Sequence, residues 1–160
     1  MRQGWKISLS MKRTFAKKGI TLIELLIVIS LIGVFSYLGM PYFKSFVAYS
    51  NLSRDSWMIL SDLRTYRELS IVEHYNYGFV FNTTKNSYTI EKRDPATNAL
   101  ISQVKTQTLE SDITLATNTE FFPTGEATPQ STIKIIGENP KDQFQISVSA
   151  VTGLTKLTKL

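Results

Sequence analysis

The chain has 160 residues, which is enough for one small domain and an additional segment but not for two substantial domains. It contains no cysteine, so the sequence excludes metal–thiolate sites, cysteine nucleophiles and a disulfide framework. The formal net charge is +5, yet six of the 18 lysine and arginine residues, and no acidic residue, lie in residues 1–19. Residues 20–160 therefore carry 12 basic residues (18 − 6) against 13 acidic ones, which removes the general electrostatic argument for binding a polyanion.

Residues 20–40 form an apolar segment of 21 residues in which Glu24 is the only charged residue. A helix needs about 20 apolar residues to cross the hydrocarbon core of a bilayer. The basic residues before the segment predict a cytoplasmic N-terminus, with everything after Pro41 outside. A secretory signal peptide is the alternative, but its apolar region is about 7–15 residues long, and Ser36–Gly39 is a poor match to its Ala-x-Ala-like cleavage site.

Glu24 requires an explanation, because a carboxylate at the centre of a membrane helix costs about 2.5–3.5 kcal/mol on insertion scales. In one interpretation, Glu24 lies near the lipid headgroups and pairs with Lys17 or Lys18. In the other, the chain begins at Ile20, and its new α-amine lies one helical turn from Glu24. The carboxylate then also favours the helix N-terminus, and in an assembly it could neutralise the amine of a neighbouring subunit.

The sequence KKG-ITLIELLIVISLIG resembles the N-terminal signal of type IV pilins and pseudopilins. That signal is a basic leader ending in glycine, an apolar first residue, Thr-Leu-Ile-Glu and a long apolar helix. The resemblance implies that a prepilin peptidase cleaves between Gly19 and Ile20 and methylates the new amine of Ile20. It also implies that Glu24 is the assembly glutamate. The other matched positions that bear on assembly are Thr21, Gly33 and Pro41.

Two features of this region remain open at the level of sequence. Leaders of the family are often shorter than 19 residues, and a start at Met11 in place of Met1 gives the leader MKRTFAKKG. A glycine or serine also recurs every third residue of the apolar segment. Such small residues either let membrane helices approach closely or are merely tolerated there. They are Ser30, Gly33, Ser36 and Gly39.

After Pro41, which we expect to bend the helix without ending it, a helical pattern continues to about residue 71. We therefore interpret residues 20–41 as the membrane-spanning or fibre-core helix and residues 42–72 as its amphipathic continuation. The residues predicted to share an apolar face are Phe46, Leu52, Ile59, Leu63 and Tyr66, and the charged residues predicted to lie elsewhere are Arg54, Asp55, Asp62, Arg64 and Arg67.

From residue 73 the pattern changes to short apolar runs separated by turn-forming residues, and no helical period lies between them. The first two runs flank residues 82–87 and predict a hairpin. The whole indicates an α+β fold, in which one long N-terminal helix packs on an antiparallel β-sheet domain of residues 73–160. The predicted strands are Tyr77–Phe81, Tyr88–Lys92, Leu100–Val104, Ile113–Leu115, Thr132–Ile136 and Phe144–Val148.

A second resemblance covers most of the chain. Phe121-x-Pro123-x-Gly125, followed by two strands and a closing Gly153, resembles the H-subunit minor pseudopilins of type II secretion and the FimT-like minor pilins. Residues 63–70, LRTYRELS, resemble the Leu-x-x-Ala-Arg-x-x-Ala segment of those proteins but lack the alanines. The alternative is a generic pilin sheet, because these positions hold residues that are common in strands and turns.

The sequence offers no set of residues that would make an enzyme. His74 is the only histidine, and it lies at the predicted helix–strand junction. There is no glycine-rich phosphate loop, no metal-ligand spacing and no nucleophile elbow. We therefore predict no catalytic residue, no metal and no cofactor.

These patterns predict a minor pseudopilin or minor pilin, held in the cytoplasmic membrane by one helix until it joins a fibre. Its expected partners are prepilin peptidase, other pilins or pseudopilins and, before assembly, membrane lipid. A DNA-binding minor pilin serving DNA uptake is one alternative, with Lys156 and Lys159 as weak DNA contacts. An edge strand whose lysines discourage aggregation is the favoured explanation of these two residues. A single-pass membrane protein with an unrelated exported domain is the other alternative.

Overall fold

The computed structural model describes residues 19–160, so the predictions for residues 1–18, including the pairing of Glu24 with Lys17 or Lys18, lie outside the described residues. The chain divides into two compact units, the first ending at Gly39 and the second spanning Met40–Leu160. One helix, α1 (Leu22–Glu73), contributes to both units. Each unit is described separately.

Helix α1 continues through Pro41, as expected. In the first unit every described side chain is exposed. The helix ends at Glu73, two residues later than predicted, because the next residue, His74, adopts a left-handed conformation with φ of 58°. Such a residue commonly terminates a helix. The chain then turns into the first strand.

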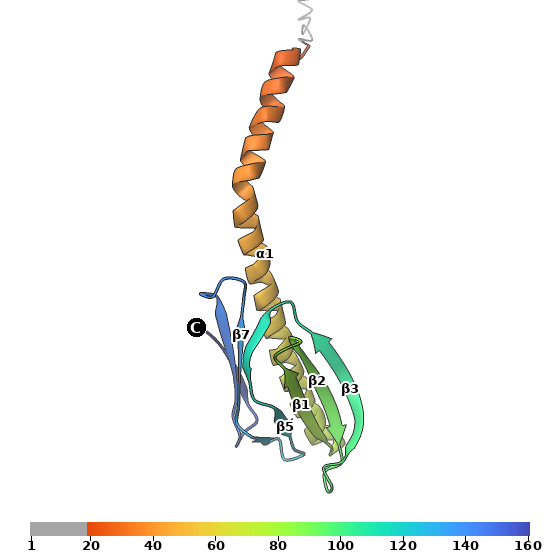
Figure 1. Ribbon diagram of the computed structural model, residues 1–160. Coiled ribbons are helices and arrows are strands. Elements are labelled where there is room, and N and C mark those ends of the chain that lie inside the picture. Colours follow the sequence, from red (N-terminus) through yellow and green to blue (C-terminus); the bar gives the residue numbers. More distant parts are fainter. Residues whose placement is uncertain (1–18) are drawn as a thin grey trace, which may run out of the picture. The chain divides into compact units, whose positions relative to one another are not determined.

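The second unit contains two antiparallel sheets beside the latter part of α1 (Figure 1). The five-stranded sheet has the order β3-β2-β1-β5-β6, and the four-stranded sheet has the order β4-β7-β8-β9. Every strand pair is antiparallel, which confirms the predicted α+β class. The strands are β1 (Asn76–Asn82), β2 (Ser87–Arg93), β3 (Leu100–Thr108), β4 (Asp112–Ala116), β5 (Thr119–Phe121), β6 (Ala127–Thr128), β7 (Ser131–Ile136), β8 (Gln143–Val148) and β9 (Thr155–Lys159).

All six predicted strands are present, and the predicted hairpin joins β1 to β2. The sequence did not predict β5 and β6, which are only three and two residues long and lie on either side of Pro123 and Gly125. Strands this short carry too few residues to show an alternating pattern. The C-terminal residues form β9, an edge strand of the four-stranded sheet.

The core of the second unit lies between α1 and the inner faces of the sheets. Leu52, Ile59 and Leu63 of the predicted apolar face are fully buried. The prediction for Phe46 is wrong, because its side chain is 69% exposed. Phe46 precedes Leu52 by six residues, which at about 100° per residue places it about 120° away around the helix.

The prediction that Asp55 lies away from the apolar face is also wrong. Asp55 follows Leu52 by three residues and precedes Ile59 by four, so it shares their face, and its side chain is 1% exposed. Its Oδ2 atom accepts hydrogen bonds from the backbone N–H groups of Glu110 and Ser111, each at 2.9 Å. These two residues join β3 of one sheet to β4 of the other. The buried carboxylate therefore fixes the connection between the sheets to the helix.

We expect Asp55→Ala to lower the free energy of unfolding by about 2–4 kcal/mol, because two backbone N–H groups, one of them that of the buried Ser111, lose their acceptor. Denaturant unfolding of the full chain in detergent, followed by circular dichroism, measures this loss. Glu110→Ala is the matched control: it removes an exposed acidic side chain from the same connection and keeps both hydrogen bonds. Equal stability of the two variants would contradict the role of Asp55.

Candidate processing and assembly site

The residues around the predicted cleavage site precede the first turn of α1. Gly19 and Ile20 are exposed and lie outside regular structure, with the Ile20 side chain 78% exposed. A Cβ atom added at Gly19 would meet no atom within 4 Å. The fold of the described residues therefore does not itself require glycine at this position.

Thr21 is the N-cap of the helix. Its Oγ1 atom accepts a hydrogen bond from the backbone N–H of Glu24 at 3.3 Å, and its carbonyl oxygen accepts one from the N–H of Leu25 at 3.1 Å. Glu24 lies in the first turn, where a negative charge interacts favourably with the helix dipole. Thr21-x-x-Glu24 has the spacing of a capping box, a helix-start signal that our sequence interpretation did not use.

Among the described residues of the first unit, 22–39 belong to the apolar part of α1, and all of their side chains are exposed. Among the described residues, α1 is the one helix long and apolar enough to cross a membrane, judged by length and composition. Cβ atoms added at Gly33 and Gly39 would meet nothing within 4 Å, and the Ser30 hydroxyl donates to the carbonyl of Leu26 at 2.8 Å. Burial of this surface thus needs lipid or other helices.

In the second unit, two further acidic residues of α1 bind the five-stranded sheet. Asp62 Oδ2 accepts hydrogen bonds from the Tyr88 hydroxyl and from Lys105 Nζ, both at 2.6 Å. Burial, together with this hydrogen bond, raises the pKa of the Tyr88 hydroxyl. Glu73 Oε2 accepts from the Tyr77 hydroxyl at 2.6 Å and from Lys92 Nζ at 2.8 Å, and the hydrogen bond from Lys92 lowers the pKa of the Glu73 carboxyl.

Arg67 brings together the segments that carry the second resemblance. Its Nε–H donates to the carbonyl oxygens of Gly125 and Thr152, each at 3.1 Å. Gly153 has a φ of 61°, and a Cβ atom there would overlap the carbonyl oxygen of Gly125 and lie 2.7 Å from Arg67 Nε. The pattern ending at Gly125, the closing glycine and the arginine of residues 63–70 therefore meet at one point. Together these residues pack the turn after β5 and the turn after β8 against α1.

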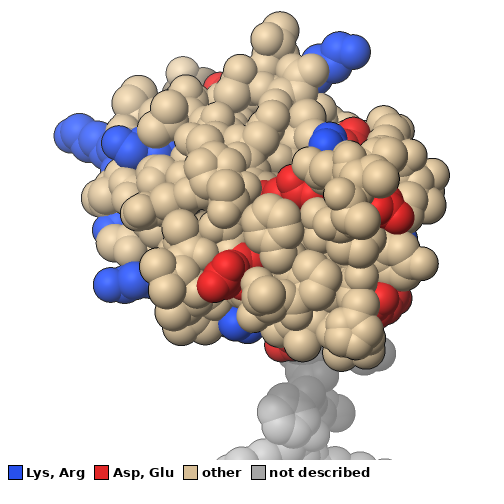
Figure 2. Space-filling model, turned by 90° about the horizontal axis from the view of Figure 1, so that it is seen from below, with Lys and Arg blue, Asp and Glu red and all other residues tan. Residues whose placement is uncertain are grey.

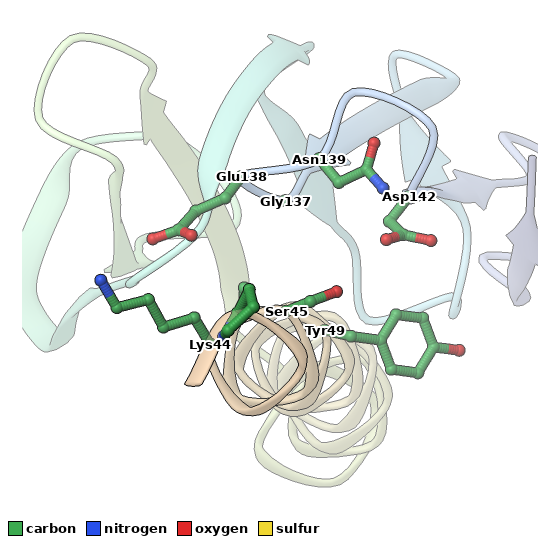
Figure 3. Close-up of a pocket in the computed structure, with 9 residues that line it drawn as sticks. Lys44, Ser45, Tyr49, Gly137, Glu138, Asn139 and Asp142 are labelled. Atoms are coloured by element: carbon green, nitrogen blue, oxygen red, sulfur yellow. The ribbon is translucent and has the colours of Figure 1, made fainter. Parts of the chain in front are cut away.

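A cavity of about 320 Å³ lies between the part of α1 that follows Pro41 and the turn that joins β7 to β8 (Figure 3). Lys44, Ser45 and Tyr49 line it from the helix, and Glu138 and Asp142 line it from the turn. No cluster of three or more metal-ligating side chains occurs among residues 19–160. The cavity thus has acidic groups on one side and a lysine on the other, without a set of ligands for an ion.

The two lysines named as DNA contacts do not converge. Lys159 Nζ lies 3.3 Å from the Tyr49 hydroxyl, on the side of β9 that faces α1. Lys156 is three residues earlier and so points to the opposite face of the strand. His74 is exposed at the end of α1.

We expect Gly153→Ala to lower the free energy of unfolding by about 2 kcal/mol or more, since the residue has a positive φ and no space for a Cβ atom. The matched control is Gly137→Ala, where φ is not positive and a new Cβ atom would meet the flexible end of Leu52 at 3.2 Å. Thermal unfolding of both full-length variants makes the comparison. A Gly153→Ala variant as stable as Gly137→Ala would show that the contact with Arg67 and Gly125 is unimportant.

The chain was compared with family models, curated proteins and solved structures. Residues 15–36 match the family model described as the prokaryotic N-terminal methylation motif. No curated protein sequence matches the chain. Among solved structures, the chain is similar to the minor pseudopilin EpsH from the type 2 secretion system of Vibrio cholerae, with a TM-score of 0.57 and 15% sequence identity over 68% of this chain and 97% of that one. The chain thus combines a match to the prokaryotic N-terminal methylation motif with a fold similar to that of a minor pseudopilin.

Proposed function

We propose that this chain is a minor pseudopilin or minor pilin, a structural subunit of a type II secretion pseudopilus or a type IV pilus. The observation that carries the proposal is the position of the methylation motif. It lies at the start of an apolar helix whose described side chains are all exposed in the first unit, and the α+β domain that follows resembles that of a minor pseudopilin.

The proposed sequence of events begins in the cytoplasmic membrane. The basic leader stays in the cytoplasm, residues 20–41 span the bilayer once, and the domain of residues 73–160 lies in the periplasm or at the cell surface. Prepilin peptidase cleaves between Gly19 and Ile20 and methylates the amine of Ile20. The subunit then leaves the lipid and joins the helices of other pilins or pseudopilins, which bury the same apolar side chains.

Glu24 has the central role in this transfer. In the lipid, its carboxylate lies one turn from the α-amine of Ile20 and offsets that charge. In the fibre, it neutralises the amine of a neighbouring subunit within the apolar layer, where an unpaired charge is costly. Thr21 holds the first turn, and Gly33 and Pro41 are the other assembly positions that the motif implies. A structural subunit of this kind needs no catalytic centre and no cofactor.

DNA uptake is the less favoured alternative. It requires basic side chains that together follow a phosphate backbone. Lys156 and Lys159 point to opposite faces of β9. The face drawn in Figure 2 carries acidic as well as basic side chains.

Cleavage is tested by Gly19→Val in cells that contain prepilin peptidase. We expect the wild-type protein to be recovered from the membrane as a chain that begins at Ile20, and the variant to keep its leader. Since the space around Gly19 is open, the substitution leaves the fold unchanged. Intact mass spectrometry measures the mass of each protein and so shows whether the leader is present. For the uncut chain it also shows whether the start is Met1 or Met11. Ile20→Phe, which keeps an apolar first residue, should still be cut. A wild-type chain that stays uncut would favour the unrelated single-pass protein.

Glu24→Ala should be cleaved and inserted normally but should enter fibres about 100-fold less often, which corresponds to about 3 kcal/mol for an uncompensated buried charge. Immunoblotting of sheared fibres, normalised to the cleaved membrane pool, measures this ratio. Glu24→Gln separates two roles, because glutamine can replace glutamate in a capping box but carries no charge. If Glu24→Gln enters fibres as well as the wild type, the charge is not what assembly uses.

A further inference from the structure

A pocket of about 250 Å³ in the second unit contains two oriented guanidinium groups. Arg64, Arg67 and Glu68 line it from α1, and residues 153–155 line it from the segment that leads into β9. Arg64 Nε–H donates to the Thr155 hydroxyl at 3.2 Å. Arg67 Nε–H is held by the two backbone carbonyls described above. We call this the arginine pocket.

Each Nε–H has a protein acceptor, whereas the terminal nitrogens of both guanidinium groups have none among the described residues. No carboxylate of residues 19–160 lies within 4.0 Å of either arginine, and Glu68, although it lines the same pocket, forms no ion pair there. A guanidinium group with free terminal nitrogens binds a carboxylate through two parallel hydrogen bonds. Because both side chains are already positioned, binding costs little additional ordering.

We propose that the arginine pocket binds an acidic side chain of a neighbouring subunit in the fibre. The proposal rests on the proposed function, since it takes the ligand from a fibre partner. It specifies a contact outside the N-terminal motif, made by the domain and not by the apolar helix. An aspartate or glutamate carboxylate on the partner is the group that the two arginines would hold.

A nucleic-acid phosphate is the competing anion, but the surroundings of the pocket favour a single carboxylate. Binding to a phosphate backbone depends on several basic groups in succession. Lys156 lies on the opposite face of β9 from Thr155, which binds Arg64, and Lys159 is held at Tyr49. Glu68 lines the same pocket and opposes any anion, but its repulsion grows with the number of charges, so it disfavours a phosphate backbone more than a single carboxylate. The pocket has room for one side chain, and no row of further basic residues extends from it among the residues that line it.

The first test is charge reversal at Arg64, whose removal leaves the Arg67 bonds to both turns intact. We expect Arg64→Glu to lower the amount of this subunit in sheared fibres at least 10-fold, with no change in the cleaved membrane pool. Arg64→Lys, which keeps the charge but cannot form the two parallel hydrogen bonds, should give an incorporation between those of the wild type and Arg64→Glu. Lys85→Glu, an exposed charge reversal in the β1–β2 turn, is the matched control and should behave as the wild type.

The second test identifies the contact directly. The chain has no cysteine, so Leu154→Cys introduces a single thiol at the edge of the pocket, where the side chain is 62% exposed. A photoreactive benzophenone attached to this thiol in assembled fibres should crosslink to a peptide of another pilin-like subunit that contains aspartate or glutamate. Replacing that acidic residue with lysine should restore the incorporation of Arg64→Glu.

The outcomes separate the two proposals. If wild-type protein never enters a fibre, the proposed function fails and this inference fails with it. If wild-type protein enters fibres and Arg64→Glu enters equally well, the inference alone is overturned. Crosslinking of the Leu154→Cys probe to nucleic acid in place of a subunit would also overturn it, in favour of a phosphate ligand.

Discussion

Hydrogen bonds from polar side chains of α1 to the strands and turns determine how the second unit is built. Asp55 holds the connection between β3 and β4, Asp62 binds β2 and β3, and Glu73 binds β1 and β2. Arg67 holds the turn after β5 and the turn after β8. The strands of the two sheets form separate ladders, and side chains of α1 bind both sheets, Asp62 the five-stranded one and Arg64 the four-stranded one through Thr155. Apolar contacts supply the burial, and the directional bonds fix which part of the chain lies where.

The two parts of α1, one after the other along the chain, therefore have different chemical environments. Its first part has apolar side chains all round, which suit lipid or other helices, and its second part has one buried face with polar groups that are satisfied by strands. A subunit that must be anchored by a helix and also present a folded domain can obtain both from one uninterrupted element. Pro41 lies within that helix without ending it.

The sequence allowed prediction of features that depend on neighbours in the chain. The apolar segment, the β1–β2 hairpin and the α+β class follow from local runs, and the Thr21–Glu24 cap could have been found from its spacing. Asp55 was misplaced because its charge suggested solvent, whereas its helical position puts it with Leu52 and Ile59. Arg67 contacts Gly125 and Gly153, which lie more than 50 positions after it in the chain. A pattern of neighbouring residues cannot predict a contact over such a separation.

The cap at Thr21 bears on how the proposed cleavage would change the start of the helix. Cutting after Gly19 places a positively charged amine next to the positive end of the helix dipole, which is unfavourable. Methylation keeps that charge. Glu24, in the first turn, is the described residue placed to offset it, because the next basic or acidic residue along the chain is Lys44. Before cleavage no α-amine is present there, and the carboxylate favours the helix N-terminus through the dipole. Cleavage would therefore convert Glu24 from a helix-start residue into one half of a charge pair, and a second amine from a neighbouring subunit can compete for it.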